Sequence, residues 1–369
     1  MKNEKTFYKN TFLGCVLIIF SCFACNDDDS GGTDSPGTGD STIILTHSGN
    51  IPIRSYKLRS SAQIPNHDPA SCKIYGSTTG KEWILLDEQQ DITFCARLQE
   101  NVYAIKSPGQ YTSYKLTINT NSKEHLYLDN IQLSETNPLE GWKDFVFPKI
   151  IFQNKDPNSQ GSKYYNQLVQ KSDEYIQYHA LKVAEILFDN ALEVPNIGTL
   201  QYILNNFNGI SMKYGAPPLI TIEFSTPYIT QCAGESFTKL DQETRGILFH
   251  ELTHAYQYEP QGIGDYSSSL IFVACVEGLA DAVRAEAGYF DLKNQRKPGG
   301  SWLEGYQTFG FFIQWLTNKD SDAIRKFNKS VRDLNPWNID GAMKYIFGTD
   351  ASFHDLWEEY QTFIISENK

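Results

Sequence analysis

The stretch KLDQETRGILFHELTHAYQYEP, residues 239–260, contains two histidines four positions apart, with a glutamate directly after the first. Asp241 is a typical N-cap residue, and the pattern after it predicts a helix over 242–258. On a helix, positions i and i+4 lie on one face about 5–6 Å apart. His250 and His254 are therefore expected to point to one place, as two ligands of a single Zn²⁺ ion require.

Glu251 lies one step round the same helix from the two histidines. From there it cannot easily join their coordination shell, but it can reach a water molecule in the open position of a metal. His-Glu-x-x-His is thus the pattern of a zinc site with a general base beside it. Two histidines on a helix can also simply pack or face solvent, so the prediction depends on a third ligand.

The segment SLIFVACVEGLADAVRAEAG, residues 269–288, supplies that ligand. It is apolar, has a helical pattern, and ends in Gly288, which suits the position after a helix. Glu277 and Asp281 lie at i and i+4 in it, and two carboxylates are costly to bury without partners. We predict that Glu277 binds the metal and that Asp281 accepts the far N–H of a ligand histidine. The alternative is an exposed helix face with two ordinary acids.

Three blocks of this half resemble one family in order: FHELTHAYQ (249–257), VEGLADAVRAEAG (276–288) and WLEGYQTFGFFIQWL (302–316). They are similar to the plant basic secretory protein family of peptidases, which also has bacterial members. The resemblance covers about residues 144–365. It implies a zincin fold, α+β and mainly helical, with a sheet and the active-site helix in one lobe and helices in the other. Its third ligand would be Glu277.

Two further residues are candidates for the site. Tyr306 is the candidate donor for the oxyanion that peptide hydrolysis would form, although a tyrosine can also simply pack. Gln257 follows His254 by three positions and is expected to line the pocket. The segment 219–224 predicts a strand, which we expect to be the edge to which an extended peptide adds itself.

The other half of the chain, residues 42–137, is predicted to be an all-β sandwich or barrel. Short runs rich in β-branched and aromatic residues are each bounded by Gly, Pro, Asn, Asp or Ser. In the turn STTGKEW, Gly80 is expected to have a positive φ. The runs are SYKLRSS, CKIYGS, WILLDEQ, NVYAIKS, SYKLTINT and LYLDNIQLSE.

The stretch DPASCKIYGSTTGKEWILLDEQQDITFCARLQENVYAI, residues 68–105, followed by YTSYKLTI and LYLDNIQLSE, resembles the discoidin domain, also called the coagulation-factor C-type domain. The resemblance implies a jelly-roll sandwich of the galactose-binding-like kind. Such domains often bind glycans, and sometimes lipid or protein, through their loops. The alternative is a structural spacer.

The N-terminus resembles that of a bacterial lipoprotein. Lysines precede the short apolar stretch TFLGCVLIIFSCFAC, which ends at Cys25, and the acidic, Gly/Ser-rich NDDDSGGTDSPGTGDS follows. We predict a signal peptide over 1–24, lipidation of Cys25, and a flexible tether over 25–41 that holds the protein at the surface of the bacterial outer membrane. An ordinary secretory signal is the alternative.

Composition limits the partners. The net charge is −12, the pI is about 5.1, and no basic run occurs, which argues against a nucleic-acid partner. The length suggests two domains, and TNPLEGWKD (136–144) looks like the boundary. The predicted domains are 42–137 and 144–369.

Four cysteines remain after the predicted signal and the lipidated position. They are compatible with two disulfides, Cys72–Cys95 and Cys232–Cys275, or with four buried thiols.

The sequence therefore predicts a surface-anchored zinc peptidase with one Zn²⁺ per chain, a protein or glycoprotein substrate, and a discoidin-like module that attaches to glycan. Two alternatives remain. One is a glycan-binding lipoprotein whose peptidase-like half is inactive, and the other is a zinc hydrolase of a non-peptide substrate.

Overall fold

The structure is a computed structural model that describes residues 40–62, 65–120 and 126–367. The chain divides into two compact units, one up to Glu140 and the other from Gly141 onward. Within the described ranges, every helix is too short or too polar to cross a membrane. The predicted signal peptide, Cys25 and most of the predicted tether lie outside the described residues.

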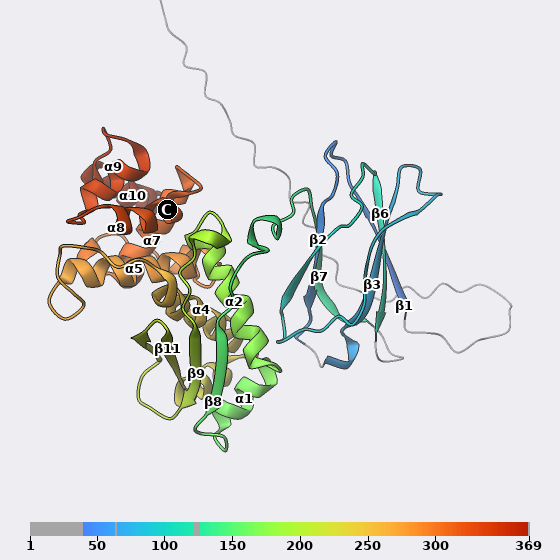
Figure 1. Ribbon diagram of the computed structural model, residues 1–369, viewed down its shortest axis with the longest axis horizontal. Coiled ribbons are helices and arrows are strands. Elements are labelled where there is room, and N and C mark those ends of the chain that lie inside the picture. Colours follow the sequence, from blue (N-terminus) through green and yellow to red (C-terminus); the bar gives the residue numbers. More distant parts are fainter. Residues whose placement is uncertain (1–39, 63–64, 121–125, 368–369) are drawn as a thin grey trace, which may run out of the picture. The chain divides into compact units, whose positions relative to one another are not determined.

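The first unit is a sandwich of two antiparallel sheets (Figure 1). One sheet has the strand order β1-β6-β3-β4 and the other β5-β2-β7. Each of the six predicted runs forms a strand, and Gly80 has a φ of +74°. The strands are β1 (Asp40–Thr46), β2 (Ser55–Ser60), β3 (Pro69–Ser77), β4 (Ile84–Gln89), β5 (Glu100–Ala104), β6 (Ser113–Thr120) and β7 (Leu128–Ser134).

Alternate side chains of both sheets fill the space between them. Tyr56 and Leu58 of β2 and Leu116 and Ile118 of β6 are fully buried, while the residues between them are more exposed. This period of two is what a strand with one face in a core requires. The prediction of an all-β sandwich is confirmed.

The second unit begins with a four-stranded sheet in the order β10-β11-β9-β8. β11 runs parallel to β9 and antiparallel to β10, and β8 runs parallel to β9. The strands are β8 (Lys149–Asn154), β9 (Thr199–Asn205), β10 (Ser211–Ala216) and β11 (Leu219–Ser225).

The prediction that segment 219–224 forms the sheet edge is wrong. That segment is β11, which is buried along most of its length and has a neighbour on each side. The strands at the two edges are β8 and β10. β10 is mostly exposed, and its sequence SMKYGA lacks a run of strong strand formers. It forms because a two-residue connection, Pro217 and Pro218, folds it back onto β11.

Four helices accompany the sheet: α1 (Gln160–Leu168), α2 (Ser172–Leu187), α3 (Thr226–Glu235) and α4 (Phe237–Tyr256). α2 packs against β8 and α4 (Figure 1). α4 also packs against β10. The predicted N-cap of α4 is wrong. The cap is Ser236, whose side chain accepts a hydrogen bond from the Lys239 N–H. Asp241 lies buried in the second turn, where its Oδ1 is 2.6 Å from Nε of Arg245.

The rest of the second unit is helical, which confirms the prediction of an α+β, mainly helical fold. α5 packs against α4 on one side and α7 on the other. Aromatic side chains such as Phe309, Phe312, Phe327 and Trp337 fill the interior. The helices are α5 (Leu270–Glu286), α6 (Leu292–Gln295), α7 (Tyr306–Trp315), α8 (Ala323–Asp333), α9 (Ile339–Phe347) and α10 (Phe353–Glu367).

Two glycines allow α5 and α7 to approach closely. A Cβ atom at Gly278 would lie 2.5 Å from the Phe309 ring, and one at Gly310 would lie 2.7 Å from the Asp281 Cβ and 2.9 Å from the Gly278 carbonyl oxygen. A Cβ atom at Gly310 would be too close to the backbone of α5, so this position needs glycine. A Cβ atom at Gly278 would push the Phe309 ring out of its place. The close approach also holds the backbone around Asp281 in place.

We expect Gly310→Ala to lower the free energy of unfolding by about 1–3 kcal/mol, because the added methyl group overpacks this contact. Gly234→Ala is the matched control, since it makes the same change in helix α3 with nothing within 4 Å of the new Cβ. It should raise stability by up to about 1 kcal/mol through helix propensity. Scanning calorimetry of both variants tests this, and equal melting temperatures would contradict it.

Cys72, Cys95, Cys232 and Cys275 are all buried free thiols. The structure therefore agrees with the alternative of four buried thiols and not with the two disulfides. Such thiols behave as small apolar side chains of the cores.

Candidate metal centre

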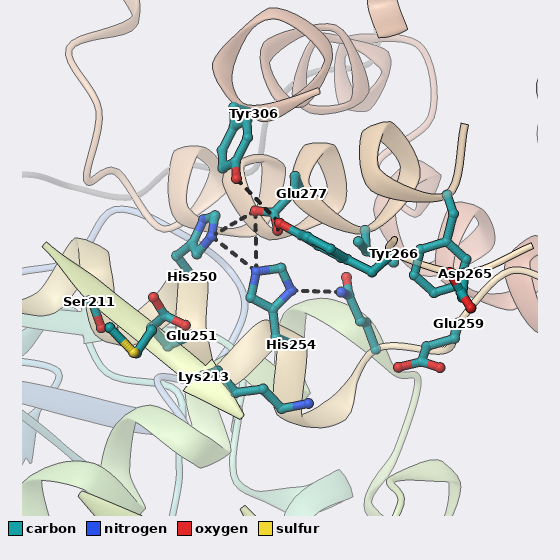
Figure 2. Close-up of a pocket in the computed structure, with 14 residues that line it drawn as sticks. Ser211, Lys213, His250, Glu251, His254, Glu259, Asp265, Tyr266, Glu277 and Tyr306 are labelled. Atoms are coloured by element: carbon teal, nitrogen blue, oxygen red, sulfur yellow. Dashed lines mark hydrogen bonds and ion pairs between the residues drawn. The ribbon is translucent and has the colours of Figure 1, made fainter. Parts of the chain in front are cut away.

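Helices α4 and α5 bring His250, His254 and Glu277 together (Figure 2). The two Nε2 atoms of the histidines lie 3.0 Å apart. Oε2 of Glu277 lies 3.2 Å from Nε2 of His250 and 3.4 Å from Nε2 of His254. The histidines meet because they are one helical turn apart, and the glutamate reaches them because α5 packs against α4.

This donor set fits a zinc ion. A tetrahedral ion bound at about 2.0–2.1 Å holds its ligand atoms roughly 3.3–3.4 Å from one another. The three separations in this structure, 3.0, 3.2 and 3.4 Å, are close to that spacing without any movement of the helices. Two imidazoles and one carboxylate are also ligands that Zn²⁺ accepts in proteins, with a fourth position left for water.

Asp281 holds the first histidine. Its Oδ1 lies 2.7 Å from Nδ1 of His250, so this nitrogen donates to the carboxylate and the other nitrogen, Nε2, faces Glu277. Burial lowers the pKa of His250, but hydrogen bonds to Asp281 and Glu277 outweigh burial and raise it to about 10. The surroundings of this ring therefore favour positive charge, whether a proton or a metal ion supplies it.

Gln257 contacts the second histidine. Its side-chain amide lies 2.8 Å from Nδ1 of His254. The Oε1 atom of this amide is buried and has no hydrogen-bond partner among the described residues. With a metal on Nε2, Nδ1 of His254 carries the proton and needs an acceptor. A 180° rotation of the Gln257 amide group would place its Oε1 atom there as the acceptor.

Tyr266 holds the glutamate, and sequence reasoning missed this residue. Its hydroxyl donates to Oε1 of Glu277 over 2.8 Å, which leaves Oε2 directed at the histidines. Burial and hydrogen bonds to Tyr306 and Glu277 raise the pKa of Tyr266, so the hydroxyl keeps its proton at neutral pH. Tyr266 lies in the loop between α4 and α5, where no spacing pattern singles it out.

Glu251 lies beside the three donors and is only 6% exposed. It lines a cleft of about 530 Å³ together with His250, His254 and Glu277. Figure 2 shows it next to His250, on the side of Ser211 from strand β10. Its carboxylate is therefore placed to contact a water molecule held near the three donors.

Tyr306, the predicted oxyanion donor, also lines this cleft. Its ring lies parallel to that of His250, with centroids 6.3 Å apart, and its hydroxyl is 3.5 Å from that of Tyr266. Its φ of +40° is unusual for a residue with a side chain. Strained backbone of this kind is often found at functional sites.

Two histidines four apart on one helix and a carboxylate from a second helix, with a glutamate directly after the first histidine, form an arrangement that is typical of metal-dependent hydrolases. The model of a family described as "Peptidase of plants and bacteria" matches residues 147–360. This is more than half of the chain, and the chain therefore belongs to that peptidase family. The resemblance seen in the sequence is confirmed.

Several solved structures are similar to the N-terminal region of this chain. They include CBM32-5 of CpGH89 from Clostridium perfringens in complex with GalNAc-β-1,3-galactose, at 12% identity and a TM-score of 0.23, covering 26% of this chain and 67% of that one. The C-terminal domain of a Bacteroides fragilis chitobiase has 15% identity and a TM-score of 0.22, with 26% and 62% covered. An F5/8 type C domain from the same species has 12% identity and a TM-score of 0.23, with 26% and 64% covered.

The described part of the chain thus spans about two thirds of the length of these structures, and at such identities the likeness concerns the fold alone. None of the curated proteins matches the chain.

Proposed function

We propose that the second unit is a zinc peptidase in which His250, His254 and Glu277 hold one Zn²⁺ ion. The observation that supports this most strongly is the spacing of their three donor atoms, 3.0–3.4 Å, beside a buried glutamate in an open cleft. Membership of a peptidase family makes a peptide bond the expected target.

When bound, Zn²⁺ would lower the pKa of a water molecule to about 7 and polarise the scissile carbonyl. Glu251 accepts the proton of that water as it attacks, and then passes the proton to the leaving amine. A buried carboxylate suits this step because it is fixed in place.

Other side chains orient the groups that act. Asp281 fixes the His250 tautomer so that Nε2 is free to bind the metal, and Tyr266 fixes the rotation of the Glu277 carboxylate. The Tyr306 hydroxyl, in the cleft above the histidines, donates a hydrogen bond to the oxyanion that develops during attack.

The experiment that tests this proposal combines metal analysis with an assay. Mass spectrometry of the metals in the purified protein should find one zinc ion per chain, and the protein should cleave a mixed peptide library. A chelator should abolish cleavage, and added zinc should restore it. Zinc without cleavage would favour a non-peptide substrate or an inactive peptidase-like unit, and absence of zinc would contradict the metal site.

We expect Tyr266→Phe to lower zinc affinity by about 10–100-fold, because loss of a group that orients a ligand typically has an effect of this size. Titration with a zinc-binding dye measures the change directly. Tyr214→Phe is the matched control, because it removes another tyrosine–glutamate hydrogen bond, of 2.7 Å to Glu223, away from the three donors. Equal affinities of the two variants would show that Tyr266 does not orient Glu277.

We also propose that the β-sandwich attaches the peptidase to glycans or glycoproteins, and that lipid on Cys25 anchors the chain at the surface of the outer membrane. The discoidin-like and lipobox-like segments support these two proposals. A glycan array with the purified protein tests the first, and metabolic labelling with a fatty acid, with Cys25→Ser as control, tests the second.

A further inference from the structure

The cleft at the metal centre is one part of a longer groove in the second unit. A second cavity of about 630 Å³ lies next to the first and is lined by residues such as Ile210, Ile247, Phe290 and Thr308. A third cavity, of about 280 Å³, is lined by the loop containing Gly299 and Gly300 and by Gln361 of α10.

Neighbouring cavities in this series share lining residues. The first and second share Ser211, His250, Glu251 and Tyr306. The second and third share Glu304, Gln307 and Thr308. The candidate metal centre therefore lies where the first two cavities meet, and the groove extends away from it on both sides.

Edge strand β10 runs beside this junction. Ile210, which precedes it, lines the second cavity, Ser211 lines both, and Lys213 lines the first. An edge strand offers backbone N–H and C=O groups to another extended chain. A peptide that pairs with β10 would therefore follow the groove across the metal centre, with residues on each side of the bond near Glu251.

We infer that this site is an endopeptidase site, which binds an extended inner segment of a polypeptide and does not need a free chain end. The inference rests on the proposed peptidase function. A site for chain ends needs a charged group that captures the terminus close to the reacting bond. The arginine that lines the second cavity, Arg284, is already engaged by Glu243 at 3.0 Å and by the Tyr289 carbonyl oxygen at 3.2 Å.

Three other charged residues, Lys213, Glu259 and Asp265, also line the first cavity (Figure 2). Asp265 accepts hydrogen bonds from the hydroxyl groups of Ser267 and Ser268, each over 2.7 Å. If Lys213 or Glu259 captured the terminus of a substrate, only peptides with that free end would be cleaved. This outcome separates the endopeptidase from an exopeptidase.

The test uses one sequence of about ten residues, which extends over roughly 33 Å, in two forms. One form has free ends, and the other is acetylated and amidated. An endopeptidase cleaves both forms at the same inner bond. Cleavage of the free form alone, with residues removed from one end, would overturn the inference but leave the peptidase in place. If neither form is cleaved by zinc-loaded protein, the proposed peptidase function itself fails.

A substitution tests whether the third cavity belongs to the substrate path. Gln307 is exposed on α7 where the second and third cavities meet, so Gln307→Trp should obstruct the groove there. We expect kcat/KM for the long peptide to fall about tenfold, equivalent to about 1.4 kcal/mol. The loss should be smaller for a peptide of about four residues, which spans roughly 13 Å.

Gln167→Trp is the matched control, since Gln167 is exposed on α1 and does not line the groove. Its kcat/KM should equal that of the wild type with both peptides. If Gln307→Trp cleaves the long peptide as well as Gln167→Trp does, the groove beyond the second cavity does not hold substrate, and the extended binding mode is wrong.

Discussion

Glu251→Gln should retain one zinc ion per chain and lose peptide cleavage by about 10²–10⁴-fold, the usual contribution of a general base. Glutamine has almost the same shape as glutamate but cannot accept a proton from water at neutral pH. Because Glu251 makes no hydrogen bond to the three donors, its replacement leaves their spacing unchanged. Metal analysis and the library assay, run on the same sample, measure both halves of this result.

Glu235→Gln serves as the control, since it makes the same change at the exposed end of helix α3. It should match the wild type in zinc content and rate. If Glu251→Gln keeps full activity, another group removes the proton, and the assignment of the base is wrong. If it loses its zinc, Glu251 contributes to metal binding instead.

Glu277→Ala should lower zinc affinity by more than about 100-fold, because even the loss of a group that only orients a ligand lowers affinity by 10–100-fold. The two histidines remain on α4, but they lose the Glu277 carboxylate that faces their Nε2 atoms. In addition, His250 keeps Asp281 as a partner, so the variant should still fold. Equilibrium competition with a chelator of known affinity gives the change.

The control is Glu286→Ala, at the exposed end of the same helix α5, which should bind zinc as the wild type does. Stoichiometric zinc in Glu277→Ala at low free metal would show that the third ligand lies elsewhere.

Local sequence patterns predicted the parts of the site that lie on single helices. The pair His250 and His254 follows from helical periodicity, and the apolar segment around Glu277 indicated that its carboxylates would be buried. Both helices exist close to the predicted bounds, and Gly288 has the expected positive φ of +85°. The start of α4 was misplaced because both Ser236 and Asp241 are good caps, and sequence alone does not rank them.

Features that depend on contacts between distant segments were missed. Tyr266 lies in a loop whose path is determined by the packing of α4 against α5, so no periodicity identifies it. Strand β10 has few strong strand formers and exists because β11 is available to pair with it. Strand propensity along the sequence therefore could not predict that β10 lies at the edge of the sheet, nor the direction of the groove beside it.

The ligands of the candidate metal centre come from two helices that belong to different parts of the second unit, α4 beside the sheet and α5 among the helices. An ion bound there would join the two parts as a non-covalent cross-link, so occupancy and folding would be thermodynamically coupled. At a free metal concentration 100 times the dissociation constant, binding to the folded state alone adds about 2.7 kcal/mol to its stability. At the proposed location on the outer membrane, the supply of metal outside the cell would then govern the lifetime of the protein as well as its activity.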